Sequence, residues 1–302
     1  MDLFWPLVTV RWLHLASLLG LFGSALFAMY SRPPGSDRHG LSCELAGGGL
    51  GAWLAAAALA SGICWVGLSL LDASEDVASL VSPAWWQTYL IETSFGRIWM
   101  LRLAGLVALL LCFNRWPRSP GLPAGLIAGL SAGLIASLAW LGHAVADRGP
   151  QLFAGLFAYG CHVLAAGAWL GGLLPLGLLL SNARAARDLD GVRTLLERFS
   201  RLGTLAVTLI LASGLLSAGL RTQGFANLFQ TTYGNVLLCK IALFAVLLAL
   251  AATNRFVFLA RLRRPGEATS LRALSRSVLL EQFIGVSIVG LAAVLSSLAP
   301  GS

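Results

Sequence analysis

Eight long apolar stretches, separated by short polar connections, constrain this chain more than any other feature of its sequence. A helix needs roughly 20 mostly apolar residues to cross a membrane. Hydrophobic residues make up 57% of the 302 residues and charged residues only 11%, whereas soluble domains carry about 25% charged residues. So few charges exclude soluble enzymes and nucleic-acid-binding proteins. We therefore predict an all-α, polytopic membrane protein whose eight transmembrane helices lie at about residues 5–30, 45–71, 96–113, 122–142, 152–181, 200–222, 234–260 and 276–299.

The basic residues are distributed unevenly over the connections. The loops that follow odd-numbered spans carry 15 of the 21 Lys and Arg residues. Because basic loops stay in the cytoplasm, we expect both termini on the outer side, which in a bacterium is the periplasm. The net charge of +8 then reflects topology, and we expect lipid but no nucleic acid as a partner. The acidic residues expected to attract cations to the outer side are Asp72, Glu75, Asp76 and Asp147.

Two spans begin with the same motif and carry a cation at the same spacing. The third span opens with residues 93–96, Thr-Ser-Phe-Gly, and has Arg102 six residues after the glycine. The seventh opens with residues 231–234, Thr-Thr-Tyr-Gly, and has Lys240 six residues after the glycine. Each cation either snorkels towards water or balances a buried negative group, such as a carboxylate or a haem propionate.

Further matches extend this similarity to the first, second, fifth and sixth spans. The sequence Leu-Ala-Ser-Gly occurs at residues 59–62 and 211–214, and His14 and His162 are each followed nine residues later by glycine. Because each unit would hold four spans, an even number, the repeats should be parallel and related by an axis along the membrane normal. The predicted domains are two four-helix repeats, residues 1–148 and 149–302.

Histidines within the spans are the main functional candidates, because ionisable residues are expensive in a membrane. At 1.5 Å per residue, His14 and His162 both lie roughly 13 Å from the outer ends of their spans. Neutral imidazole is a common ligand of copper, iron and zinc. A simpler interpretation is that each histidine only bonds a neighbouring helix. The candidate metal ligands are His14, His143, His162, Cys161 and Met100.

Two further charged residues fall in the spans. Arg11 lies one turn before His14 and is a third charge partner or propionate candidate alongside the two repeat-related cations. Glu281 lies in the eighth span, where it either pairs with a cytoplasmic arginine or forms part of a proton or exit route.

The assembled motifs resemble the copper resistance protein D (CopD/PcoD) family of bacterial inner-membrane proteins. The motifs that carry the resemblance are residues 11–14, 93–102, 142–144, 162–175, 199–203 and 233–240, with Glu281. The resemblance implies eight helices, copper transport from periplasm to cytoplasm in copper homeostasis, and a periplasmic copper protein of the CopC type as partner. A transporter is then expected rather than an enzyme, and a homo-oligomer is an open alternative.

The histidine-bearing four-helix unit is also similar to HemJ-type membrane protoporphyrinogen oxidases, which bind haem. That resemblance implies a different class of protein, in which His14 and His162 would ligate one haem b and Arg102 and Lys240 would lie near its propionates. Three hypotheses therefore stand at this point: a copper carrier, a bis-histidine haem redox protein, and an accessory membrane subunit whose histidines only hold helices together.

Overall fold

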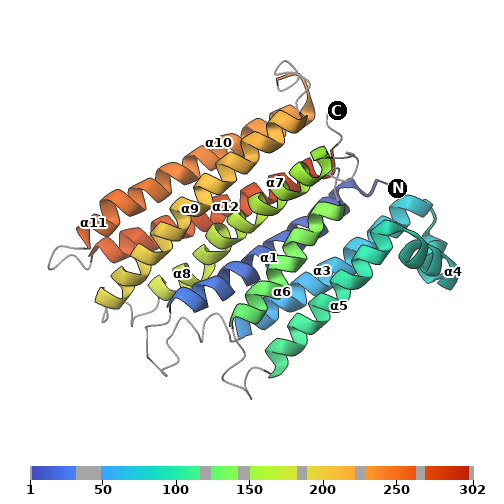
Figure 1. The fold of residues 1–302 in the computed structure, drawn as a ribbon, viewed down its shortest axis with the longest axis horizontal. Helices are drawn as coiled ribbons and strands as arrows, with labels where there is room; N and C mark the ends of the chain where they lie inside the picture. Colours follow the sequence, from blue (N-terminus) through green and yellow to red (C-terminus); the bar gives the residue numbers. More distant parts are fainter. Residues whose placement is uncertain are drawn as a thin grey trace.

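The computed structural model describes residues 2–31, 49–115, 124–141, 150–181, 189–221, 229–262 and 269–298. Within these ranges the chain is helical without strands, and eight helices are long and apolar enough to cross a membrane. The all-α prediction and the eight predicted spans are therefore confirmed. Figure 1 shows the spans lying side by side as one bundle, with the start of the first and the end of the last at the same end.

Several spans are continuous helices and others are interrupted. The continuous spans are α1 (Phe4–Ser31), α3 (Gly49–Ser74), α5 (Ser94–Arg115), α9 (Leu189–Arg221) and α12 (Thr269–Leu295). The interrupted spans are α6 (Ala124–Ala136) with η4 (Ser137–Leu141); α7 (Pro150–Ala166) with η6 (Gly167–Gly171) and α8 (Gly172–Ser181); and α10 (Thr232–Thr253) with η8 (Asn254–Phe258) and α11 (Leu259–Arg261). Three short helices cap the end of the bundle near the N-terminus: η1 (Val77–Val81), α4 (Pro83–Gln87) and η2 (Thr88–Glu92).

Helix α1 is the centre of the bundle. It packs against α3, α6, η6, α8 and α12, so it contacts both halves of the chain. Every residue from 17 to 25 is buried, whichever way it faces. A helix that is apolar on all sides must be surrounded by protein or lipid, and here the surroundings are other helices.

The two halves meet where α1 crosses η6, and glycines allow the backbones to touch. A Cβ atom added to Gly23 would overlap the backbone of Gly171 and Gly172, and one added to Gly171 would overlap the carbonyl of Leu19. Small residues of this kind allow close packing of membrane helices, which depends on van der Waals contact rather than the hydrophobic effect.

The fifth span contains a π-turn at this crossing, and Pro175 explains its position. Proline has no backbone N–H and its ring clashes with the carbonyl four residues earlier, which here belongs to Gly171. The α-helix cannot pass regularly through this point, and the wide turn of η6 ends at Gly171. The interruption lies five residues after His162, on the same span.

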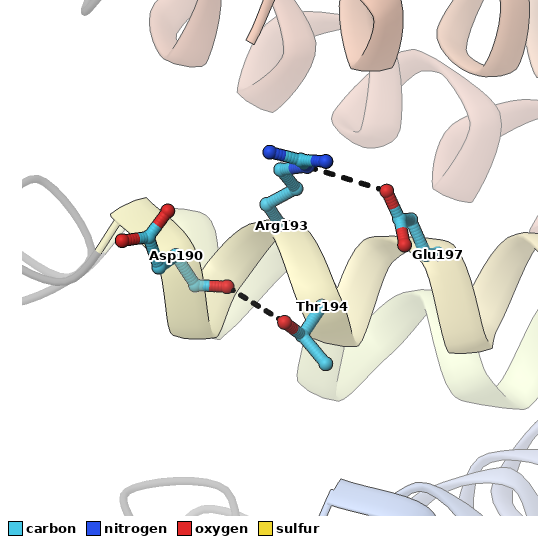
Figure 2. A network of polar contacts seen from close by, with 4 residues as sticks. All are labelled: Asp190, Arg193, Thr194 and Glu197. Atoms are coloured by element: carbon cyan, nitrogen blue, oxygen red, sulfur yellow. Dashed lines mark hydrogen bonds and ion pairs between the residues drawn. The ribbon is translucent and has the colours of Figure 1, made fainter. Parts of the chain in front are cut away.

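The sixth span starts earlier than predicted. The expected start at residue 200 is wrong, because α9 begins at Leu189. Charged residues lower the mean hydropathy of this segment, but its apolar residues recur at helical spacing and are buried: Val192, Leu195, Leu196 and Phe199. Figure 2 shows the polar face, where Arg193 bonds Glu197 at 3.3 Å and the Thr194 hydroxyl donates to the carbonyl of Asp190 at 2.9 Å. Pairs four residues apart support a helix in this way.

We predict that Gly23→Ala destabilises the protein by about 3 kcal/mol, the upper end of the cost of overpacking, because the obstructing atoms belong to backbone. Gly67→Ala is the matched control, since a Cβ there meets no atom within 4 Å. Thermal unfolding of the purified variants in detergent measures both effects. Equal stability of the two variants would contradict the close crossing.

Candidate functional site

His14 is fully buried and both of its ring nitrogens are engaged. Nδ1 lies 2.9 Å from the backbone carbonyl oxygen of Ala58, and Nε2 lies 2.6 Å from Nη2 of Arg102. A carbonyl can only accept a hydrogen bond and a guanidinium can only donate one. His14 is therefore a neutral imidazole with its proton on Nδ1, and its Nε2 lone pair accepts from Arg102.

Arg102 is held by neutral acceptors. It is 2% exposed, and its Nη1 donates to the Leu134 carbonyl and the Ser137 hydroxyl of the fourth span. Tyr159 of α7 interacts with it electrostatically. Across the described ranges, no carboxylate lies within ion-pair distance of Arg102. The guanidinium thus spans the first half, from α1 to the fourth span, with no counter-ion among the described residues.

Two tryptophans enclose the imidazole. The ring centres of Trp65 and Trp99 lie 5.7 and 5.4 Å from that of His14, and 5.0 Å from each other. The Arg102 guanidinium carbon lies 4.9 Å from the centre of the Trp99 ring, a cation–π distance. These rings exclude water, so the charge and dipoles inside interact more strongly than they would in solvent.

His162 occupies a similar but more open position in the second half. Its Nδ1 lies 3.1 Å from the Ser213 hydroxyl, and Lys240 interacts with it electrostatically. His162 and Lys240 are both half-buried. His162 also has a backbone hydrogen bond to Ile210, and in the described part of the chain the side-chain contact to Ser213 is made by Nδ1, not by Nε2.

Each histidine lies against a Ser-Gly pair. Ser61 Oγ is 3.5 Å from Nδ1 of His14, matching Ser213 beside His162. A Cβ atom on the following glycine would meet the imidazole Cε1 at 3.3 Å for Gly62 and 3.7 Å for Gly214. Gly62 therefore lets the His14 ring approach the neighbouring helix closely, whereas a Cβ at position 214 would make an ordinary van der Waals contact with His162.

The matching threonine motifs begin the helices that carry the two cations. The Gly96 N–H donates to Thr93 Oγ1 at 2.9 Å, and the Gly234 N–H donates to Thr231 Oγ1 at 3.0 Å. A threonine that accepts such a bond caps a helix N-terminus. Since both cations follow at the same spacing, each lies the same number of residues after its threonine cap. The division of the chain into two repeats stays a prediction.

Those of the remaining predicted ligands that the structure describes do not form a metal site with His14. Met100 is 39% exposed on α5, and Cys161 is half-buried as a free thiol beside His162 in sequence. His143 and Asp147 lie outside the described residues. Among the residues that are described, no three His, Cys, Asp or Glu side chains come together as a metal site.

Arg11 ties the first span to the last. Its Nη1 donates to the Ser296 carbonyl at 3.2 Å and to Ser297 Oγ at 2.7 Å. Its guanidinium carbon lies 5.2 Å from the centre of the Trp65 ring. Arg11 therefore closes the end of the bundle above the tryptophans, rather than bonding His14.

An acidic pocket opens at this same end. It has a volume of about 260 Å³ and is lined by Leu3, Leu71, Asp72 and Glu75. Asp76 lies outside that lining and accepts from the Ala78 N–H as a helix cap. Burial raises the pKa of nearby Tyr89 to about 12, so this phenol stays neutral. The pocket is a region of negative charge beside Arg11.

Glu281 lies near the middle of α12 and is 2% exposed. Asn254, the first residue of η8, hydrogen-bonds its carboxyl group. Oxygen Oε1 of Glu281 is buried without a hydrogen-bond partner. The predicted pairing with a cytoplasmic arginine is not among the ion pairs of the described residues.

The two histidine sites differ in what they offer a metal. An iron or copper ligand needs a free nitrogen lone pair, and in this arrangement His14 has none. The first half therefore does not fit a permanently ligated haem iron, whereas His162 Nε2 is free. For His14 to bind a metal, Arg102 must first move away.

Several site residues were not predicted as such. Ser61 and Ser213 lie in the Leu-Ala-Ser-Gly motifs, so the repeat contained their signal. Trp65 and Trp99 lie three residues from Gly62 and Arg102 respectively, on the same helix faces. For Asn254, the only signal in the sequence was its position at the end of the seventh span.

The fold and these sites define a class: multi-pass helical membrane proteins with imidazoles buried between their membrane-spanning helices. Within this class the chain belongs to the copper resistance protein D family. The profile of the copper resistance protein D-like N-terminal domain matches residues 1–153, and that of copper resistance protein D matches residues 193–295.

Three relatives share much of the chain. Copper resistance protein D of Pseudomonas syringae pv. tomato is 32% identical over 97% of this chain and 96% of its own length. Inner membrane protein YebZ of Escherichia coli (strain K12) is 28% identical over 97% of this chain and 98% of its own length. Copper transport protein CutJ of Bacillus subtilis (strain 168) is 31% identical over 80% of this chain but 45% of its own length. No solved structure matches the chain.

We predict that His14→Ala costs about 3 kcal/mol or more of stability, because it leaves a buried charge without its acceptor. His162→Ala should cost about 1 kcal/mol, because it removes a hydrogen bond to Ser213 rather than an acceptor bonded directly to a buried cation. Thermal unfolding in detergent compares the two. The double variant His14→Ala/Arg102→Leu should be more stable than His14→Ala alone, and a simple sum of the single effects would contradict the coupling.

Proposed function

We propose that this protein carries copper across the bacterial inner membrane, from periplasm to cytoplasm, and uses intramembrane histidines as exchangeable ligands. The observation that supports this most is the pair of imidazoles at corresponding positions of the two halves, each beside a serine and accompanied by a cation. Names of the relatives, copper resistance protein D and copper transport protein CutJ, support copper as the cargo. The name of a third relative supports the inner membrane as its location.

His162 is the proposed first ligand. Its Nδ1 is fixed by Ser213, which leaves Nε2 as the available ring nitrogen. A second-shell bond of this kind orients a ligating imidazole and fixes its tautomer. Cys161 is adjacent in sequence, and its thiolate would suit monovalent copper. Met100 and His143 stay predictions as further ligands.

His14 is the proposed second ligand, and Arg102 regulates its availability. Copper and the guanidinium are both cations that seek the Nε2 lone pair, so they compete for one position. When Arg102 withdraws, His14 can bind copper; when it returns, copper leaves. Such exchange suits a carrier, which must release its cargo, better than it suits a haem protein, which retains its iron.

The outer end supplies the cation. Copper would enter past Asp72 and Glu75, whose negative charge raises the local concentration of cations. The acidic end, with both termini, is then proposed to face the periplasm, which agrees with the basic loops expected on the cytoplasmic side. A periplasmic copper protein of the CopC type is the proposed donor there, and a homo-oligomer stays a prediction.

Rocking of one four-helix half against the other would open the copper site first to the periplasm and then to the cytoplasm. The Gly23–Gly171 crossing is the proposed pivot, since backbone contact gives it no side chain that must repack. The contacts support a pseudo-twofold arrangement: α1 packs on α12, and α6 packs on α7. The proposed halves are residues 1–148 and 149–302.

We predict that His162→Ala lowers copper uptake by purified protein in vesicles at least about tenfold, a loss of about 1.4 kcal/mol or more of binding energy. Cys161→Ser should also lower it, and Cys64→Ser is the matched control because Cys64 is exposed. Vesicle copper is measured by mass spectrometry. Wild-type uptake in both histidine variants would leave only a structural role for the histidines.

The visible spectrum of the same samples tests the haem alternative. A colourless wild type is expected. A haem Soret band that is lost in both His14→Ala and His162→Ala would overturn the copper carrier as the primary role.

We predict that Arg102→Leu increases copper retention. Removing a like charge that competes for Nε2 should lower the copper Kd at least about tenfold, since charges a few ångströms apart repel by more than 1.4 kcal/mol at an effective dielectric of 20. Arg102→Lys keeps the charge and should stay near wild type. Equilibrium copper binding in detergent measures the change, and an unchanged Kd in Arg102→Leu would contradict the competition.

A further inference from the structure

Glu281 is a buried acid that the ligand exchange does not use. Its carboxyl group lies inside the bundle, 2% exposed, on the face of α12 that packs against η8. One of its oxygens accepts a bond from Asn254, while Oε1 has no partner. A buried carboxylate without partners is costly, and groups in this position neutralise instead.

The neighbouring polar groups are buried oxygens without a hydrogen-bond partner among the described residues. Asn254 Oδ1 is buried without a partner, and so is Oγ of Ser277, which lies one turn before Glu281 on α12. Carboxyl, amide and hydroxyl oxygens are hard ligands that suit a proton or a hard cation and do not suit soft monovalent copper. The cluster of Glu281, Asn254 and Ser277 is hereafter the acid cluster.

No basic side chain on the adjoining helices neutralises the acid cluster within the described residues. On α12 itself, Arg272 and Arg276 are exposed. On η8, Arg255 donates to Thr204 and the Ser200 carbonyl of α9.

The elements on the other sides of α12 bring no counter-ion either. On α1, Arg11 bonds the far end of α12 and His14 bonds Arg102. The remaining titratable side chain of α1 is the half-buried phenol of Tyr30. On α10, Lys240 interacts with His162, and Cys239 is exposed. Tyr233 is in the first turn of α10, at the opposite end from η8, and α8 contains no titratable residue.

We propose that the acid cluster is a proton-binding site, and that its proton is exchanged for copper. This deepens the proposed function and rests on it for the copper half of the claim. Glu281 is protonated when the second half holds no copper. As a copper ion passes, the carboxyl O–H bond breaks, its proton leaves to water, and the carboxylate that remains offsets the charge of the copper ion. One proton moves against one copper ion.

The protonated carboxyl is tested first without copper. Infrared spectra of the protein in lipid nanodiscs at neutral pH should contain the carbonyl band of a protonated carboxylic acid. The band should disappear in Glu281→Gln and persist in Glu92→Gln, whose exposed glutamate is the matched control. Asn254→Ala should shift the band, because it removes a hydrogen bond from the carboxyl. A wild-type band that is unchanged in Glu281→Gln would overturn the proton site.

The exchange is tested in vesicles that contain the purified protein, with the membrane potential clamped at zero. The steady-state ratio of internal to external copper should rise about tenfold for each pH unit by which the lumen is more acidic. This ratio does not depend on the orientation of the protein. In Glu281→Gln the ratio should no longer respond to pH, while Glu92→Gln behaves as wild type. A Glu281→Gln ratio that still follows pH, or a wild-type ratio that ignores it, would overturn the exchange.

The two proposals fail in different ways. If wild-type vesicles take up no copper at any pH while the Glu281 band is present, the copper carrier fails, exchange fails with it, and the proton site stands. If copper uptake is normal but no Glu281 band is seen, the carrier stands and the proton site fails. If Glu281→Gln does not fold, Glu281→Asp serves instead: it should retain a protonated-acid band, shifted from the wild-type position.

Discussion

The backbone contact between α1 and η6 is the constraint on which the rest of this structure depends. It requires glycine at positions 23 and 171, because a Cβ at either would overlap backbone of the other span. The contact keeps α1 at the centre, where it touches α3, α6, α8 and α12. His14 precedes this contact on α1, and His162 precedes it on the fifth span. The crossing therefore sets the position of both histidine sites relative to one common point.

The two sites show how a membrane protein distributes the cost of burying charge. Arg102 is fully enclosed, and a neutral imidazole, a carbonyl and a hydroxyl accept bonds from its two terminal nitrogens, while its Nε has no partner among the described residues. Lys240 is half-buried and interacts with His162 only electrostatically. In the better enclosed first half, Arg102 occupies Nε2 of His14. In the less enclosed second half, Nε2 of His162 is free. The similar motifs produce one closed site and one open site.

Hydropathy predicted all eight spans, since length and apolar content decide which segments can cross a membrane. The threonine motifs predicted where the two cation-bearing helices begin, and both threonines do cap those helices. Contacts between helices were harder: nothing in the spacing predicted that Arg102 would bond His14 rather than snorkel. The early start of α9 was missed because hydropathy averages over a helix whose buried residues, such as Leu195, alternate with charges. The π-turn depends on Pro175. A proline in the sequence predicts where a helix is interrupted, but not the geometry of the interruption.

Arg102, His162 and Glu281 can be understood as parts of one electrostatic balance. A bare cation in the middle of a membrane needs either a counter-charge or polar ligands. In this chain the Arg102 guanidinium occupies the acceptor nitrogen of His14, whereas His162 keeps its acceptor nitrogen available. Glu281 is an acid without a basic partner in the described part of the chain. An arriving cation would change all three states at once: Arg102 is repelled, His162 is occupied, and Glu281 becomes favoured as a carboxylate. Arg102 then opposes the movement of a cation through such a bundle, whereas His162 and Glu281 assist it. This balance allows the cation to bind reversibly.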